Sequence, residues 1–193
     1  LLVAHLIDRE RSSGLGDVTA LAAGGVVIRK TPGSPYSGHL LESGPGKSVG
    51  WKSDVDIILA WDSEYSKHTS MYIEDPVWKS TITSSGNENL RRLLEGTWDE
   101  SRWGDLVSSS KGFSLDSGLS EEPARANVLK TCEASIQEFE MGENSTPLLC
   151  MLGTSVAIVP TSINSTLGNV ESIMKSLNQK GLSTILTRIG NIL

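Results

Sequence analysis

The chain has 193 residues, a formal charge of −6, and a composition that is 38% apolar, 21% charged and 5% aromatic. A chain of this length buries enough surface to fold without disulfides or metals, and its two cysteines are too few for a disulfide framework. No apolar run approaches the roughly 18 residues that a membrane span needs, and a negative surface excludes coating of nucleic acid by bulk electrostatics. These observations predict one globular domain in the cytoplasm, without membrane contact.

The first part of the chain is punctuated by glycine, serine and proline. Helices and a strand are predicted there from apolar spacing and breaker residues, at residues 1–11, 17–23 and 26–28. A Gly/Ser break separates the two helices at residues 12–16, and residues 31–38 are predicted to be loop. We treat residues 1–36 as an N-terminal extension of a single domain over residues 1–193.

The remainder of the chain alternates between strand and helix patterns. Residues 55–61 form a mostly apolar run, which is typical of a strand buried on both faces and therefore of a central, parallel strand. The other predicted elements are strands at residues 71–73, 105–107 and 147–160, and helices at residues 87–96, 120–140 and 169–180. This alternation predicts an α/β fold with a mainly parallel, Rossmann-like sheet and helices on both faces.

A glycine turn follows a short apolar stretch at residues 40–48, LLESGPGKS. In open parallel sheets, such a turn lets the backbone approach a ligand, and acids that end neighbouring strands bind the ligand's hydroxyl groups. Glu42 ends the first predicted strand, Gly44 and Gly46 make the turn, and Asp62 ends the next strand twenty positions after Glu42. This pattern predicts a nucleoside site at the rim of the sheet.

The same residues resemble the first motif of class I S-adenosylmethionine-dependent methyltransferases, in which a hydrophobic strand ends in an acid followed by x-Gly-x-Gly-x-Gly. The resemblance implies S-adenosylmethionine as the cofactor. It implies that Glu42, Gly44 and Gly46 line the methionine part and that Asp62 accepts hydrogen bonds from the ribose.

Two residues further along the chain complete the implied cofactor site. The resemblance places Asp75 near the adenine, and Trp78 follows closely enough to stack on an adenine or another base. A nucleotide-binding surface made from acids and one aromatic ring is the expectation that follows.

The order of elements after residue 87 resembles the small RNA 2′-O-methyltransferases of the FtsJ-like and viral cap-methylating kind. Those enzymes use a Lys-Asp-Lys-Glu set, in which lysine lowers the pKa of the attacking hydroxyl. Ser110 stands at the position of the aspartate, and Lys30 and Lys111 are the nearest lysines. The resemblance therefore implies methyl transfer to RNA, at a 2′-hydroxyl or a base, with these three residues as catalytic candidates and a local basic patch for the RNA.

Departures from the family pattern keep a second interpretation open. The third glycine of the motif is Ser48, and the predicted fifth strand offers Cys150 or Met151 in place of lysine. A degenerate Rossmann-like domain with a structural or interaction role is the main alternative.

Two nucleotide-binding alternatives arise from neighbouring residues. Gly46-Lys47-Ser48 matches the end of a phosphate loop, although Leu41 stands where the loop's first glycine belongs. Asp54 and Asp56 have the spacing of a nucleotidyltransferase metal pair. The chain begins at Leu1 rather than Met, which predicts a fragment or processed product of a larger protein or assembly.

Overall fold

The computed structural model describes the chain except residues 12–15, 39–41, 65–71, 73, 151 and 191–193. The chain divides into two compact units. The first comprises Leu1–Asp54, Leu93–Glu100 and Ile189–Leu193, and the second comprises Val55–Arg92 and Ser101–Arg188. Each unit has its own sheet structure, and the single domain expected over residues 1–193 remains a prediction.

The first unit contains two helices and two small antiparallel sheets in its described part. Its elements are α1 (Leu2–Arg11), α2 (Gly16–Ala23), β1 (Val26–Thr31), β2 (Tyr36–Ser37), β3 (Glu42–Ser43) and β4 (Lys47–Trp51). β1 pairs with β4, and β2 pairs with β3. The predicted helices and the strand at residues 26–28 are confirmed, with Val26 and Ile28 buried on the inner face of β1.

The glycine turn of this unit leads into a strand, because β4 begins at Lys47. Gly44 N donates a hydrogen bond to the Pro35 carbonyl at 2.8 Å, and Gly46 N donates to the Ser34 carbonyl at 2.8 Å. Side chains on either glycine would collide with the backbone of the loop between β1 and β2. Glycine is therefore required here for the close approach of two backbone segments.

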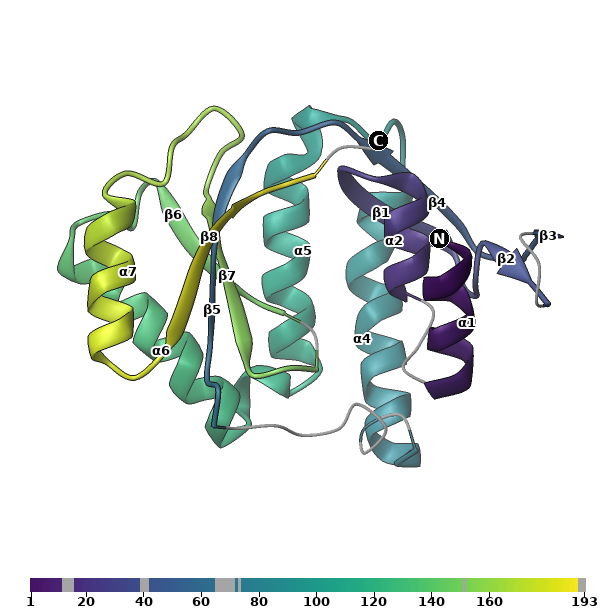
Figure 1. The fold of residues 1–193 in the computed structure, drawn as a ribbon, viewed down its shortest axis with the longest axis horizontal. Helices are drawn as coiled ribbons and strands as arrows, with labels where there is room; N and C mark the ends of the chain where they lie inside the picture. The colour runs from purple at the N-terminus through teal and green to yellow at the C-terminus, as the bar shows by residue number, and fades with distance from the viewer. Residues whose placement is uncertain (12–15, 39–41, 65–71, 73, 151, 191–193) are drawn as a thin grey trace. The chain divides into compact units, whose positions relative to one another are not determined.

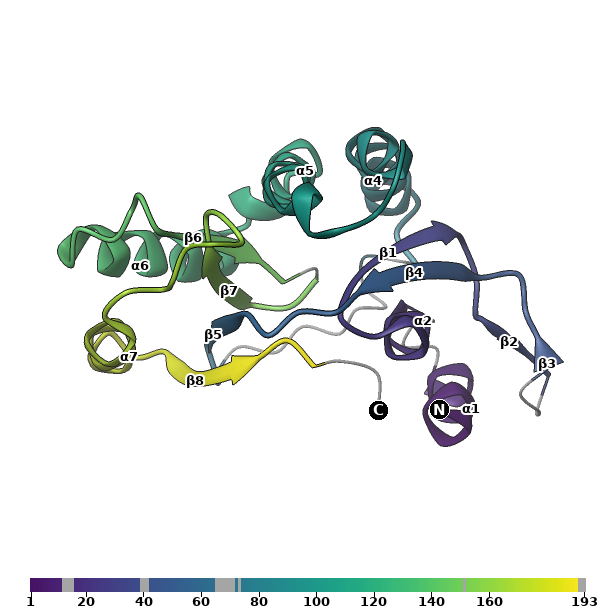
Figure 2. The same cartoon turned by 90° about the horizontal axis from the view of Figure 1, so that it is seen from above.

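The second unit is built on a four-stranded sheet with the order β6-β7-β5-β8. Its strands are β5 (Asp56–Trp61), β6 (Ser145–Leu149), β7 (Ser155–Pro160) and β8 (Ser183–Arg188). Its helices are α5 (Trp103–Asp116), α6 (Pro123–Glu138), α7 (Val170–Gln179) and all but the last two residues of α4 (Pro76–Leu94). Short 3-10 turns lie at Glu100–Arg102 and Leu119–Glu121. Figures 1 and 2 show the four strands with α6 and α7 along them.

The prediction of a mainly parallel Rossmann-like sheet is wrong. All strand pairs in the described part of the chain are antiparallel. β5 is central, as predicted, but it runs antiparallel to both β7 and β8. The bend near Gly153 joins β6 to β7 through a short turn, which connects antiparallel neighbours, whereas parallel strands need a long crossover. The predicted strand at residues 105–107 lies inside α5.

The core of the second unit lies between the sheet and two helices. Its buried members come from β5, β7, α6 and α7, and include Ile58, Ala60, Val156, Ile158, Val128, Cys132, Ile136, Ile173 and Leu177. Ile58 pairs with Ile158 and Ala60 with Val156, so these four side chains share one face of the sheet. α6 and α7 therefore cover the same face.

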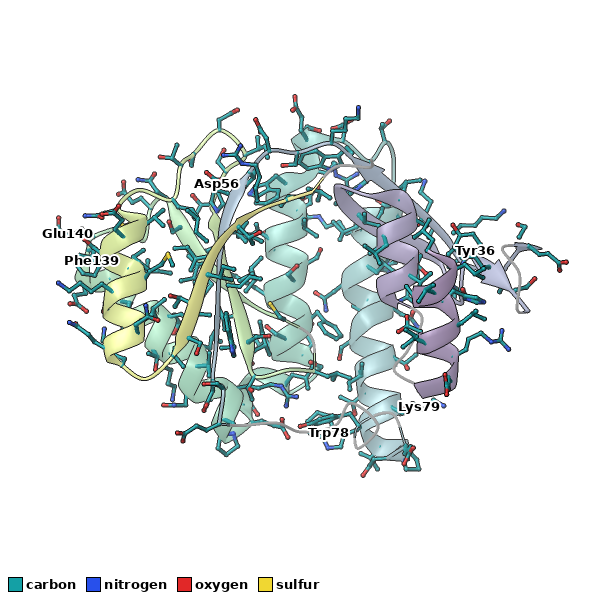
Figure 3. The ribbon with its side chains drawn as sticks, viewed as in Figure 1. Tyr36, Asp56, Trp78, Lys79, Phe139 and Glu140 are labelled. Atoms are coloured by element: carbon teal, nitrogen blue, oxygen red, sulfur yellow. The ribbon has the colours of Figure 1, made fainter. Side chains whose placement is uncertain are left out.

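An exposed ion pair joins the outer strand to the central one. Arg188 Nε donates to Asp56 Oδ1 at 2.7 Å, and Figure 3 labels this aspartate. Of the strand predicted at residues 71–73, only Tyr72 lies within the described residues, and it is helical. No helix in the described ranges combines the length and the apolar character that crossing a bilayer requires.

Candidate functional site

One end of the four-stranded sheet gathers charged and aromatic side chains. β5 ends at Trp61, and the amide of the next residue, Asp62, donates to the Thr154 carbonyl in the β6–β7 turn at 3.3 Å. Asp62 Oδ1 accepts a hydrogen bond from Glu64 N at 2.9 Å. These two bonds hold a half-buried carboxylate at the end of the central strand.

A buried arginine fastens the turn at this end of the sheet. Arg125, in the first turn of α6, is 1% exposed. Its Nε donates to the Gly153 carbonyl at 3.1 Å, and its Nη2 donates to the Leu152 carbonyl. Glu122 forms an ion pair with the guanidinium, which balances its charge in the interior.

Two aromatic residues extend this cluster. Tyr72 accepts a hydrogen bond from Arg125 Nη1 at 2.9 Å and donates its own hydroxyl proton to Glu122 Oε2 at 2.8 Å. The Tyr72 ring meets Trp78 edge-on, with the ring centres 5.3 Å apart. Figure 3 labels Trp78, which belongs to the first turn of α4. The cluster therefore ties the beginnings of α4 and α6 to the β6–β7 turn.

Asp75 has a structural task in the same region. Its Oδ1 accepts hydrogen bonds from Val77 N at 2.8 Å and Trp78 N at 3.0 Å. These are the bonds of a helix N-cap, which satisfies amides that have no partner within the helix. Its carboxylate is thus engaged by the first turn of α4.

The nine residues predicted for the methyltransferase site fall in both units. Glu42, Gly44, Gly46 and Lys30 belong to the first unit, and Asp62, Asp75, Trp78, Ser110 and Lys111 belong to the second. Asp62 is hydrogen-bonded to the β6–β7 turn through its amide, and Trp78 contacts Tyr72, a partner of Arg125. Lys30 and Glu42 are exposed on strands, whereas Ser110 and Lys111 lie in the middle of α5.

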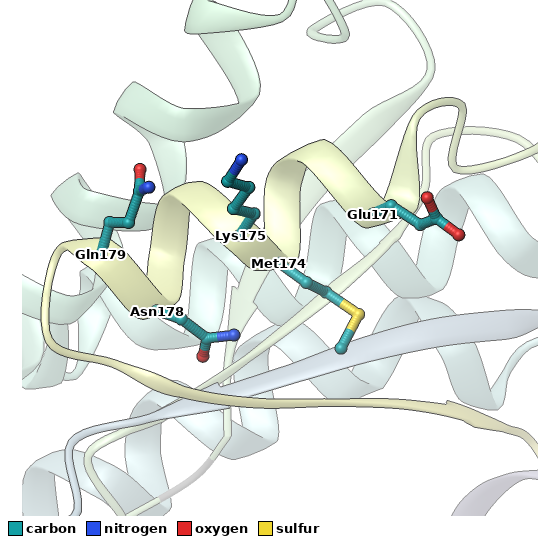
Figure 4. A pocket seen from close by; sticks show the side chains of 5 residues that line it. All are labelled: Glu171, Met174, Lys175, Asn178 and Gln179. Atoms are coloured by element: carbon teal, nitrogen blue, oxygen red, sulfur yellow. The ribbon is translucent and has the colours of Figure 1, made fainter.

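The second unit also has a shallow open hollow beside α7 (Figure 4). Its lining side chains are Glu171, Met174, Lys175, Asn178 and Gln179. All of these side chains come from one surface of a single helix. Ligand sites are usually clefts or cavities enclosed by several elements, so the hollow does not have the form of a ligand site.

A glycine-containing segment that sequence analysis treated as a simple break precedes α2. Residues 12–16 read SSGLG, and α2 begins at Gly16; residues 12–15 lie outside the described part. Thr19 of α2 is hydrogen-bonded to the rest of the first unit. Its carbonyl accepts a hydrogen bond from Ser48 Oγ at 2.9 Å, and its Oγ1 donates one to the Gly33 carbonyl at 3.3 Å. A glycine-rich segment leading into a helix N-terminus is a common phosphate-binding arrangement.

Comparisons with known proteins find two similar kinases. The chain is 29% identical to a pantoate kinase from Methanocaldococcus jannaschii over 174 residues, which are 90% of this chain and 55% of that protein. It is 28% identical to a pantoate kinase from Methanospirillum hungatei over 184 residues, which are 95% of this chain and 53% of that protein. The chain spans about half the length of these curated relatives. No protein-family model matches it, and no solved structure does.

These findings correct the methyltransferase interpretation. The relatives are named as kinases, so S-adenosylmethionine as cofactor and methyl transfer to RNA are wrong. The fold agrees with this correction, because the resemblance required a parallel sheet and a turn that leads into a helix. Backbone packing fills the space beside Gly44 and Gly46. Among the alternatives, nucleotide binding lies nearest to the relatives' activity.

Among the residues with described placement, no group of three or more His, Cys, Asp or Glu side chains is arranged to hold a metal ion. Magnesium in phosphoryl-transfer enzymes is held by substrate phosphates with one or two carboxylates. A magnesium ion that arrives with a nucleotide therefore needs no such group of three side chains.

Proposed function

We propose that the chain is part of a kinase that transfers the γ-phosphoryl group of ATP to a hydroxyl group of a small hydroxy acid such as pantoate. The observation that carries this proposal is the extent of the similarity, which runs over at least 90% of the chain in both pantoate kinases. Similarity of this extent involves both units, whereas a shared nucleotide motif alone would be local.

The first unit would supply the phosphate-binding element. The SSGLG segment precedes α2, and the amides at a helix N-terminus favour a bound phosphate through their hydrogen bonds and the helix dipole. Val18 and Thr19 of α2 are buried, and Thr19 is hydrogen-bonded to Gly33 and Ser48, so the helix is packed within the first unit.

The proposal also needs a carboxylate for the acceptor. In this reaction the bond between the γ-phosphorus and the bridging oxygen of ATP breaks, a new bond forms to the substrate hydroxyl oxygen, and the hydroxyl proton leaves. Kinases orient the hydroxyl and accept its proton with a carboxylate. Asp62, at the end of β5, is our candidate for that role.

The test measures binding and turnover separately. Isothermal titration with Mg²⁺-ATP is expected to give saturable binding, while S-adenosylhomocysteine gives none. Addition of pantoate is expected to produce ADP and phosphorylated acid in equal amounts. If the protein neither binds ATP nor phosphorylates a hydroxy acid, the proposal is wrong.

Matched variants locate the nucleotide site. Gly16→Glu adds a carboxylate at the first residue of α2, where it favours the helix but competes with phosphate for the same amides. We expect ATP affinity to fall by roughly tenfold or more, the factor that a loss of about 1.4 kcal/mol produces. Ala20→Glu adds the same charge at an exposed position of the helix and should leave ATP binding nearly unchanged.

The acceptor side has its own pair of variants. Asp62→Asn should reduce kcat by roughly 10²-fold or more, since general acid–base catalysis contributes about that much, and should leave ATP binding intact. Glu143→Gln removes an exposed carboxylate in the turn before β6 and serves as the control. Equal activity of the two variants would remove Asp62 from the site.

Three further expectations remain predictions. A kinase that uses the ATP pool would work in the cytoplasm, the location that composition predicted, and cell fractionation tests it. Contact with RNA through a local basic patch, and a place in a larger protein or assembly, are tested by RNA-binding titration and by the mass of the native complex.

A further inference from the structure

Arg125 is a buried residue whose guanidinium makes several polar contacts, which a residue that only fills the core would not need. Its guanidinium meets a carboxylate, a phenol and two successive backbone carbonyls, contributed by Glu122, Tyr72, Leu152 and Gly153. The guanidinium carbon also lies 4.7 Å from the centre of the Tyr72 ring. An arginine is buried at a cost unless its donors are matched in this way.

The partners of Arg125 define what it can do. Both of its carbonyl acceptors belong to the β6–β7 turn, so the planar guanidinium fixes the orientation of two consecutive peptide units. Because Nε and both terminal nitrogens have protein partners, Arg125 serves the protein rather than a ligand.

A short path of contacts leads from this turn to the candidate catalytic carboxylate. Gly153 N donates to the Cys150 carbonyl at 3.3 Å and Cys150 N donates to the Ser155 carbonyl at 2.8 Å, which closes the turn. Thr154 follows Gly153 in the turn, and its carbonyl accepts a hydrogen bond from the amide of Asp62 at 3.3 Å. A shift of the turn would therefore move the end of β5.

We propose that Arg125 is a positioning residue, which acts through the carbonyls of Leu152 and Gly153 to hold the β6–β7 turn and, with it, Asp62 at the end of the sheet. The inference rests on the proposed kinase function. It assigns to Arg125 an effect on turnover that a general contribution to stability does not produce. The nucleotide site is proposed at α2, and Arg125 is assigned no contact with ATP, so ATP affinity is the internal reference.

The main test compares Arg125→Lys with Arg91→Met. Lysine keeps the charge next to Glu122 but cannot donate to two carbonyls from a planar fork. Arg91 is an exposed arginine of α4 that pairs with Glu88, so its replacement controls for loss of a surface charge. For Arg125→Lys we expect an unchanged circular dichroism spectrum and an ATP Kd within about twofold of wild type. We expect kcat to fall by roughly tenfold to 10²-fold, because a small misplacement of reacting groups has an effect of this size.

A second variant keeps the test decisive if Arg125→Lys does not fold. Tyr72→Phe removes only the hydroxyl that links Arg125 to Glu122 and retains the ring that meets Trp78. It should lower kcat by a few-fold, with ATP affinity unchanged. Amide exchange in residues 152–155 should become faster in both variants, while exchange in α7 stays at the wild-type rate.

The outcomes separate the inference from the function on which it rests. Absence of ATP binding and turnover in the wild-type protein would refute the kinase proposal, and the inference would fall with it. An active wild type with fully active Arg125→Lys and Tyr72→Phe would refute the positioning role alone. A proportional loss of ATP binding, kcat and thermal midpoint in these variants would also refute it, because it would indicate general destabilisation.

Discussion

The carbonyl oxygen of Gly33 occupies the space that a side chain on Gly46 would need. The two loops that meet there are joined by further bonds, since Thr31 Oγ1 donates to the Pro45 carbonyl at 2.7 Å and accepts from Lys47 N at 2.8 Å. The turn at residues 44–46 is therefore a packing element of the first unit. Sequence reasoning interpreted the same glycines as room for a nucleoside.

This contact predicts a stability defect. Gly46→Ala should lower the free energy of unfolding by about 1–3 kcal/mol, the usual cost of overpacking, because the opposing atom is backbone and cannot rotate away. Urea denaturation followed by circular dichroism measures it. As the control, Gly104→Ala changes an open site in α5 and should stabilise that helix by up to about 1 kcal/mol. Equal effects of the two substitutions would contradict the proposed packing role.

Periodicity and breaker residues located most elements but not their pairing. The helix at residues 169–180 was predictable because apolar residues recur on one face and Gly181 follows its end. The run at residues 55–61 signalled a buried central strand, but strand direction depends on the connections between strands, which local sequence does not encode. Residues 105–107 form too short an apolar run to distinguish strand from helix, and they belong to α5.

The candidate site was partly predictable for a similar reason. An acid at a strand end is visible in sequence, so Asp62 could be singled out as a candidate, and its role remains a prediction. Arg125 was not, since its partners Tyr72 and Gly153 are 53 and 28 residues away along the chain. The SSGLG segment before α2 can also be recognised in the sequence. The glycine turn at residues 44–46 resembled a known motif more closely and was interpreted as the site instead.

Two buried tryptophans provide a test of how independent the two units are. Trp98 Nε1 donates to the Val26 carbonyl at 2.9 Å in the first unit, and Trp103 Nε1 donates to the Pro160 carbonyl at 2.8 Å in the second. Each Trp→Phe substitution should cost about 1–3 kcal/mol, because a buried acceptor loses its donor. Amide exchange is expected to accelerate in β1 for Trp98→Phe and in β7 for Trp103→Phe. Acceleration throughout the chain by either variant would instead support a single cooperative domain.

The two cysteines should differ in reactivity. Burial, with a smaller contribution from Glu133, raises the pKa of Cys132 to about 12, and burial also raises the pKa of Cys150. Only the thiolate reacts with iodoacetamide, so at pH 8 the folded protein should leave Cys132 unlabelled. Cys150 is partly exposed and should react faster than Cys132, though more slowly than in urea. Equal labelling of Cys132 with and without urea would contradict this.

The raised thiol pKa also sets a stability limit at high pH. In the unfolded chain Cys132 ionises near its ordinary value of 9.0, whereas in the folded protein it stays protonated to about 12. The contribution of the buried Cys132 thiol to the free energy of unfolding is therefore complete below pH 9 and is lost as the pH rises from 9.0 towards about 12. Thermal midpoints between pH 8 and 11 should fall less steeply for Cys132→Ala than for wild type, and parallel curves would refute the effect.

At low pH the junction of α6 and α7 should respond instead. Lys180 Nζ donates to Glu138 Oε2 at 2.7 Å and to the hydroxyls of Ser135 and Ser176, each at 2.9 Å. The hydrogen bond from Lys180, followed by that from Ser176, lowers the pKa of Glu138 below 4.5. Since the folded pKa is the lower one, the stabilisation is present above pH 4.5 and is lost as the pH falls through the folded value. Lys180→Met should therefore flatten the decline of the thermal midpoint below pH 4.5. Lys175 is an exposed lysine of α7, and the control Lys175→Met should retain the wild-type slope. Identical slopes for the two variants would show that the Lys180–Glu138 pair does not govern acid stability.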